Sequence, residues 1–434
     1  MSTMHHARSR LRPLTATWLC AMLLAGCIGS VVHESPSARG PATTPSATTA
    51  PSTGPASAVP SIPATPLPTA TVAPTARPTA SPSAAADCAG DVLGSLSEAQ
   101  RVGQLFMIGL VKDRLDDAER AAIRDQHLGS MLFTATTTVG VDGVRAVTDA
   151  VQAEATDANT GRIGFLIAAN QEGGLIQALR GKGFQRIPSA VEQGGMAPSM
   201  LEQDASRWGR ELVRAGVNLD LAPVADVVPA GTEDDNAPIG QLQREYGGDP
   251  VTVGTHVAAF IRGLANGGAA TSAKHFPGLG RVAGNTDHVA DVVDTVTTRD
   301  DPFVRPFGAA IRAGVPFVMV SLATYERIDP GHLAVFSPTI MGAMLRDDLG
   351  FGGVVLSDAL GATAVASIPA GQRAIDYLGA GGDMLVVNQT PDAVAMAQAL
   401  LARANQDDAF RRRIDESALR VLRAKEALGL LPCG

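Results

Sequence analysis

Short apolar segments alternate with amphipathic stretches along the chain from Asp87 onward. Most of the apolar segments are nearly continuous hydrophobic runs, which is typical of parallel strands that are buried on both faces. The pattern predicts eight strands: Gln104–Leu110, Gly129–Phe133, Gly164–Asn170, Val217–Val224, Thr271–Phe276, Pro316–Leu322, Gly353–Asp358 and Asp383–Asn388.

Helical periodicity occupies the stretches between these strands, and several stretches begin at a proline, which suits the first turn of a helix. The predicted helices are Asp117–His127, Met200–Ala215, Pro250–Ala265, Phe303–Ala313, Pro338–Leu349, Pro391–Ala404 and about Ala409–Leu428. Eight β–α repeats in roughly 340 residues predict the α/β class and a (β/α)8 TIM barrel. The alternative is an open, doubly wound sheet, which needs a glycine-rich turn after its first strand. Residues 110–113 contain no glycine, which favours the barrel.

The composition narrows the range of partners. The formal net charge of the 434 residues is -8, and this acidity argues against a nucleic-acid partner, because phosphate binding needs a basic surface. Only 4% of the residues are aromatic, so the core must consist mainly of aliphatic side chains.

The N-terminal residues predict export. Arginines precede an apolar run, Leu14–Leu24, that is too short to span a bilayer. The run ends in Leu24-Ala25-Gly26-Cys27, which resembles a bacterial lipobox. We therefore expect residues 1–26 to be a lipoprotein signal peptide and Cys27 to carry a lipid that anchors the protein outside the cell membrane. An ordinary signal peptide with an incidental cysteine is the alternative.

Residues 27–86 are expected to form a linker rich in Pro, Ser, Thr and Ala. Twelve of the 28 prolines lie between residues 36 and 86, where only Arg39 and Arg77 are charged. Such a segment buries too little apolar surface to offset its ordering entropy, so it is expected to be a disordered stalk. Residues 87–434 would then form a single folded domain.

Two cysteines remain for the folded region, Cys88 and Cys433 at its two ends. An exported protein meets an oxidising compartment, and the first and last elements of a barrel are neighbours, so a disulfide between them is expected. Two free thiols are the alternative.

Polar residues stand at the carboxyl ends of several predicted strands, where barrel enzymes place their active sites. These residues are Asn170, Asp220 and the following Asp226, Lys274 with His275, and Asp358. Several such residues on one face of the barrel predict a shared polar pocket. The alternative is that they cap the helices that follow the strands.

Three motifs in this order resemble glycoside hydrolase family 3, in its single-domain β-N-acetylhexosaminidase branch. They are Gln171-Glu172-Gly173-Gly174, Lys274-His275-Phe276-Pro277-Gly278 with Gly280, and Leu356-Ser357-Asp358-Ala359-Leu360. The resemblance covers about residues 95 to 430. It implies that Asp358 is the nucleophile that forms a covalent glycosyl–enzyme intermediate.

The same resemblance implies that Lys274, His275 and Arg244 bind the sugar, and we expect Asn170 and Asp220 to contribute to the same pocket. The alternative for Lys274 and Arg244 is a structural ion pair in the barrel mouth.

The sequence leaves two candidates for the proton donor, Asp287 and His288. In the hexosaminidase branch, a loop after strand five carries Asp-Ser-His, and here the matching residues are Asn285-Thr286-Asp287, followed by His288. Either Asp287 acts with a pKa raised by desolvation, or a shift of one residue allows His288 to act. The alignment favours Asp287. A third interpretation is that Asp287 and His288 are both solvated loop residues with no catalytic role.

The chain departs from the family pattern at three further positions. Asn170 stands where the family usually has Asp, Ala178 where it has a sugar-binding Arg, and Leu322 where it has His. These departures suggest a different sugar, weaker binding or a pseudoenzyme.

Two other kinds of site are not expected. The run Gly278–Ala283 loosely fits a dinucleotide fingerprint, but Pro277 precedes it and no apolar helix follows it. The histidines lack zinc-type spacing, so no metal and no cofactor are predicted.

The sequence thus predicts a monomeric, retaining exo-β-N-acetylglucosaminidase that acts on a carbohydrate, such as peptidoglycan fragments, outside the cell membrane. A non-catalytic glycan-binding lipoprotein and a β-glucosidase of the same family are the alternatives.

Overall fold

The computed structural model describes residues 87–110 and 114–433, so the predicted signal peptide, the lipidation of Cys27 and the linker lie outside the described residues. A parallel eight-stranded sheet, in the order β12-β9-β7-β6-β3-β2-β1-β13, forms the centre of the fold. Its strands are β1 (Phe106–Leu110), β2 (Ser130–Phe133), β3 (Leu166–Ala169), β6 (Leu219–Asp220), β7 (Ala270–Phe276), β9 (Phe317–Val320), β12 (Val354–Ser357) and β13 (Leu385–Val387). Leu356 pairs with Met384 across the two outer strands and closes the sheet into a barrel.

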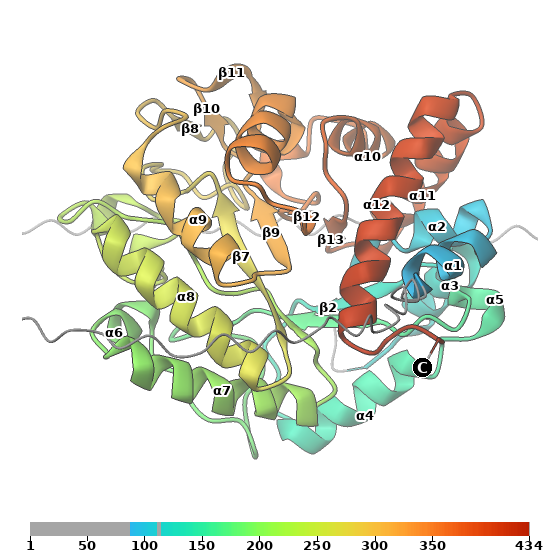
Figure 1. The fold of residues 1–434 in the computed structure, drawn as a ribbon, viewed down its shortest axis with the longest axis horizontal. Helices are drawn as coiled ribbons and strands as arrows, with labels where there is room; N and C mark the ends of the chain where they lie inside the picture. Colours follow the sequence, from blue (N-terminus) through green and yellow to red (C-terminus); the bar gives the residue numbers. More distant parts are fainter. Residues whose placement is uncertain (1–86, 111–113, 434) are drawn as a thin grey trace, which may run out of the picture. The chain divides into compact units, whose positions relative to one another are not determined.

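Helices surround this barrel (Figure 1). They are α1 (Cys88–Ser95), α2 (Glu98–Gly103), α3 (Asp117–Gln126), α4 (Gly140–Gln152), α5 (Asp157–Thr160), α6 (Ala190–Gly194), α7 (Pro198–Arg214), α8 (Pro250–Asn266), α9 (Arg305–Arg312), α10 (Ala370–Gly379), α11 (Thr390–Ala404) and α12 (Asp408–Ala427). Short 3-10 helices are η1 (Glu233–Asp235), η2 (Gly240–Leu242), η3 (Pro302–Val304), η4 (Ala334–Phe336) and η6 (Thr363–Val365), and η5 (Thr339–Asp348) is a wider π-type helix.

The predicted (β/α)8 barrel is confirmed, and each of the eight predicted strands overlaps one strand of the barrel, with β7 beginning one residue before its predicted start. The fourth strand is shorter than predicted, because Pro223 has no N–H to donate to a neighbouring strand. Its carbonyl oxygen still accepts from the backbone N–H of Lys274 at 3.1 Å, so this segment stays beside β7.

Six α-helices (α1, α2, α4, α5, α6 and α10) and two small sheets were not predicted. Helix α4 begins without a side-chain cap and is rich in valine, while α10 contains two glycines and also lacks a cap, so both have weak helical signals. The small sheets are the antiparallel pair β4 (Gln171–Gly173) and β5 (Ile176–Gln177), and the group β8 (Val293–Asp294), β10 (Thr324–Tyr325) and β11 (Asp329–Leu333).

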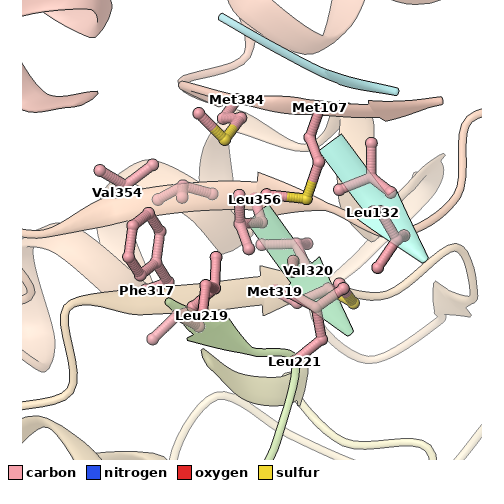
Figure 2. Close-up of a cluster of buried hydrophobic side chains, with 14 of the residues drawn as sticks. Met107, Leu132, Leu219, Leu221, Phe317, Met319, Val320, Val354, Leu356 and Met384 are labelled. Atoms are coloured by element: carbon pink, nitrogen blue, oxygen red, sulfur yellow. The ribbon is translucent and has the colours of Figure 1, made fainter. Parts of the chain in front are cut away.

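Aliphatic and sulfur-containing side chains, together with the ring of Phe317, fill the interior of the barrel (Figure 2). The labelled members are Met107, Leu132, Leu219, Leu221, Phe317, Met319, Val320, Val354, Leu356 and Met384. Since the strand interior is filled, a ligand can enter only at an end of the barrel.

The first and last helices of the domain pack together, with α1 against α12 (Figure 1). A disulfide joins Cys88, at the start of α1, to Cys433, with a Cα–Cα distance of 6.1 Å. Within residues 87–110 and 114–433, no helix is both long enough and apolar enough to cross a bilayer.

Candidate active site

A cavity of about 430 Å³ opens at the carboxyl ends of the barrel strands, the end at which barrel enzymes hold their active sites. It brings together most of the site residues that the sequence predicts. The polar residues of its lining include Asn170, Glu172, Arg244, Lys274, His275, Asn285, Asp287, His288, Asp358 and Asn388.

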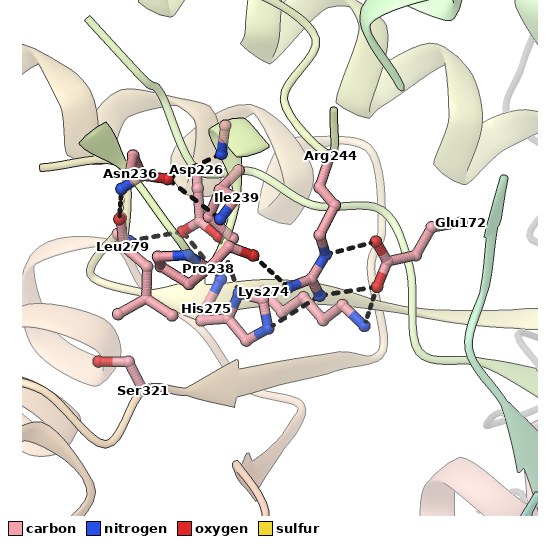
Figure 3. Close-up of polar contacts among 12 residues, drawn as sticks. Glu172, Asp226, Asn236, Pro238, Ile239, Arg244, Lys274, His275, Leu279 and Ser321 are labelled. Carbon is pink, nitrogen blue, oxygen red and sulfur yellow. Dashed lines mark hydrogen bonds and ion pairs between the residues drawn. The ribbon is translucent and has the colours of Figure 1, made fainter. Parts of the chain in front are cut away.

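One carboxylate, Glu172, pairs with two cations in the wall of this cavity (Figure 3). The guanidinium of Arg244 donates from Nε and Nη2 to the two oxygens of Glu172, both at 2.8 Å. Lys274 Nζ lies 2.6 Å from Glu172 Oε1 and donates to Asn170 Oδ1 at 2.7 Å. Burial alone would raise the pKa of Glu172, but the charges of Arg244 and Lys274 lower it to about 2. The carboxylate of Glu172 therefore remains ionised, and its ion pairs with Arg244 and Lys274 hold it in place.

The residues of the Gln171-Glu172-Gly173-Gly174 motif shape the hairpin of β4 and β5. Gln171 Nε2 donates to Leu179 O at 2.8 Å, and Leu179 N donates back to Gln171 Oε1 at 2.9 Å, which closes the hairpin. Gly173 has φ +110°, and a Cβ at this position would lie 2.1 Å from Pro188 O. Only glycine fits there, and the hairpin holds Glu172 at the cavity.

His275 is oriented by the buried carboxylate of Asp226 (Figure 3). His275 Nδ1 lies 2.8 Å from Asp226 Oδ2, and Asp226 Oδ1 accepts from the backbone N–H groups of His275 and Leu279 at 3.1 and 2.9 Å. Nδ1 is therefore the ring nitrogen that donates to Asp226, and Nε2 faces Arg244 Nη2 at 3.5 Å. An irregular pairing of β7 with β9 between Ala273 and Phe276 lets the adjacent side chains of Lys274 and His275 both line the cavity.

Asp358 directly follows β12 and is half-buried in the cavity wall. Its backbone N–H donates to Val320 O at 2.9 Å, and its Oδ1 accepts from the backbone N–H of Ala359 at 2.8 Å. Among the residues that the structure describes, Oδ2 has no hydrogen-bond partner. The carboxylate is thus fixed at one oxygen and available at the other, as a nucleophile requires.

Asp287 and His288 lie on an exposed loop that reaches the same cavity. Asn285 forms the turn of this loop, because its Oδ1 accepts from the backbone N–H of Asp287 at 3.0 Å. Partial desolvation in the cavity mouth, followed by the negative charge of Asp358, raises the pKa of Asp287. A raised pKa keeps a carboxyl group protonated at higher pH and so suits a proton donor.

Asp220 does not lie in the lining of the cavity. Its side chain is 1% exposed, and its Oδ1 accepts from the backbone N–H of Gln171 at 2.9 Å. Burial raises the pKa of Asp220 to about 7. The expected sugar contact is therefore replaced by a supporting contact that holds the strand carrying Glu172.

This raised pKa predicts a pH-dependent stability. Between the pKa of the unfolded chain, near 4, and about 7, the folded protein retains a proton on Asp220 that the unfolded chain has lost. The stabilisation is complete below pH 4 and is lost as the pH rises through 7, with a contribution of up to about 4 kcal/mol. Urea unfolding between pH 4 and 8 should show a smaller loss of stability for Asp220→Asn than for the wild type. Equal losses in both proteins would contradict the assignment.

Sequence reasoning gave Glu172 no role of its own, although this residue stands in a quoted motif, and it named Asp226 only as a polar residue after the fourth strand. The functions of both residues depend on Arg244 and His275, which are distant in the sequence. Of the departures from the family pattern, Ala178 lines the cavity and Leu322 is fully buried.

Lys274 and Arg244 are ion-pair partners of Glu172, as the structural alternative proposed, and they also line the cavity. In the part of the chain that the structure describes, no group of three or more His, Cys, Asp or Glu side chains is arranged to hold a metal ion.

The sequence and the fold are both similar to those of known proteins. Residues 98–424 match the glycosyl hydrolase family 3 N-terminal domain. A β-hexosaminidase of Methylococcus capsulatus is 32% identical over 332 residues, which cover 72% of this chain and 94% of the relative. A β-N-acetylglucosaminidase/β-glucosidase of Cellulomonas fimi is 30% identical over 354 residues, which cover 78% of this chain and 59% of the relative.

Among solved structures, the β-N-acetylhexosaminidase of Beutenbergia cavernae superposes with a TM-score of 0.75 and 45% sequence identity. The match covers 76% of this chain and 99% of that one. The motifs, the barrel and the matched residues together lead to one conclusion: this chain belongs to glycoside hydrolase family 3.

Proposed function

We propose that the protein is a retaining exo-β-N-acetylglucosaminidase. The observation that carries this proposal is one small cavity that holds the partly free carboxylate of Asp358, the loop with Asp287 and His288, and the polar wall around Glu172. The names of the Methylococcus and Beutenbergia relatives support N-acetylhexosaminides as the substrate class. A cavity of about 430 Å³ that is closed below by the packed barrel suits one terminal sugar.

In the proposed mechanism, Asp358 Oδ2 attacks the anomeric carbon while the acid on the loop protonates the leaving oxygen. The glycosyl–enzyme bond forms as the glycosidic bond breaks, and the same loop residue then takes a proton from the water that releases the sugar. Arg244, Lys274 and His275 hold the sugar by donating hydrogen bonds or, at His275 Nε2, by accepting one.

We assign the proton donor to Asp287, because it lines the same cavity as Asp358 and because desolvation, followed by the charge of Asp358, raises its pKa. Asp287→Asn is expected to lower kcat/KM by about 10²- to 10⁴-fold on a nitrophenyl N-acetyl-β-glucosaminide, whereas His288→Gln should retain most of the activity. Each of the two variants is the control for the other, because Asp287 and His288 are neighbours on the same loop. The opposite result, with Asp287→Asn active and His288→Gln inactive, would transfer the role to His288.

The Cellulomonas relative is also named a β-glucosidase, which favours a second activity on β-glucosides. Parallel assays with the nitrophenyl β-glucoside decide between one activity and two. Hydrolysis of neither substrate by the wild type would refute the proposed function.

For the setting, we propose that the enzyme is anchored outside the cell membrane through Cys27 and acts on peptidoglycan fragments. The disulfide between Cys88 and Cys433 supports an oxidising compartment. Cys27→Ala should move the protein from the membrane fraction to the soluble fraction. Release of N-acetylglucosamine from purified muropeptides tests the substrate.

A further inference from the structure

Three hydrogen bonds join the loop at residues 284–289, here called the acid–base loop, to the turn that follows β12. Thr363 Oγ1 donates to Asp287 O at 2.9 Å, and the backbone N–H of Thr363 reaches the same oxygen at 3.4 Å. The backbone N–H of Ala364 donates to Thr286 O at 3.1 Å. Within the described part of the chain, all hydrogen bonds from the acid–base loop to other segments go to Thr363 and Ala364.

The turn that receives the loop is itself rigid. It starts at Asp358, whose backbone N–H is bound to Val320 O, and the backbone N–H of Leu360 donates to Val386 O at 2.9 Å. The buried Arg373 donates from Nη1 to Leu360 O at 2.6 Å. The same turn therefore fixes Asp358 at one end and the acid–base loop at the other.

We propose that Thr363 is a positioning residue that holds the acid–base loop over Asp358. This inference rests on the proposed function, because it assigns Thr363 to the protonation step of that reaction. Proton transfer to the leaving oxygen depends on the distance between the donor and the glycosidic bond, and the turn sets this distance for Asp287 relative to Asp358. The Thr363 hydroxyl is the only side-chain group in this connection, so its loss should loosen the loop and leave the nucleophile in place.

The test compares Thr363→Val, which keeps the shape and removes the hydroxyl, with Thr363→Ser, which keeps the hydroxyl. Both are assayed on aryl N-acetyl-β-glucosaminides whose phenols range from poor to good leaving groups, and kcat/KM is used because it reports the glycosylation step. A good leaving group departs without a proton, whereas a poor one needs the acid. Thr363→Val should lose about five- to tenfold in kcat/KM on poor leaving groups and less than about twofold on dinitrophenol, and Thr363→Ser should match the wild type.

Thr255→Val is the matched control, because Thr255 Oγ1 makes the same kind of bond, to Val251 O at 2.8 Å, on the exposed face of α8. Thr255→Val should not change the dependence of kcat/KM on the leaving group. An equal loss on all leaving groups, or no loss in Thr363→Val, would overturn the inference.

Failure of the proposed function is distinguishable, because the wild type would then hydrolyse none of these substrates. Hydrogen exchange of the amides at residues 286–289 tests whether Thr363 holds the acid–base loop, and this measurement does not depend on catalysis. Faster exchange in Thr363→Val than in Thr363→Ser supports it, and equal exchange overturns it.

Discussion

Asp358→Ala is expected to lower kcat/KM on a nitrophenyl N-acetyl-β-glucosaminide by about 10⁴-fold or more, the scale on which loss of a nucleophile acts. The side chain is half-buried, and its Oδ1 accepts from the neighbouring backbone N–H of Ala359. Truncation therefore removes the attacking oxygen and leaves the barrel intact. The melting temperature should remain close to that of the wild type.

Added azide distinguishes the nucleophile from the acid/base, because this small anion can enter the space left by the removed carboxylate. Rescue of Asp358→Ala should yield the α-glycosyl azide, since azide attacks from the face that Asp358 occupied. Rescue of an Asp287 variant should yield the β-azide, because azide then opens the glycosyl–enzyme intermediate. An Asp358→Ala protein with wild-type activity, or a β-azide product from it, would refute Asp358 as the nucleophile.

Asp383→Ala is expected to lower the free energy of unfolding by about 3–5 kcal/mol, the cost of leaving buried charges unpaired. Asp383 is fully buried just before β13, at the end of the barrel opposite the cavity. Three arginines contact its carboxylate, Arg346, Arg413 and Arg420, and Ser417 Oγ donates to it at 2.9 Å. Its removal leaves these cations close together without a counter-charge.

Chemical denaturation measures this effect, and Arg420→Ala is the control. The Arg420 side chain is 33% exposed, so its loss should cost about 1 kcal/mol or less. The folded Asp383→Ala protein should retain its activity, because the cluster does not reach the cavity. Equal destabilisation by the two variants would show that the buried carboxylate is not the centre of the cluster.

The sequence determined the fold largely through local patterns. A strand such as Phe317–Val320 is apolar on both faces, so its segment is recognisable without knowledge of its neighbours. Local signals failed where an element depends on its surroundings. Helix α4 starts without a cap and is held by buried valines that pack on the barrel, and this packing is not visible in a short window of residues.

The same division holds for the site. The motifs placed Lys274, His275 and Asp358 at strand ends, and the barrel geometry brought them into one cavity. The pairing of Glu172 with Arg244 joins residues 72 positions apart, and the bond from Lys274 to Asn170 spans 104 positions. The sequence by itself determined which residues are buried and which stand at strand ends, because burial follows local periodicity. Only the tertiary structure decided which charges are paired and which pKa values shift, because those depend on distances between segments remote in the chain.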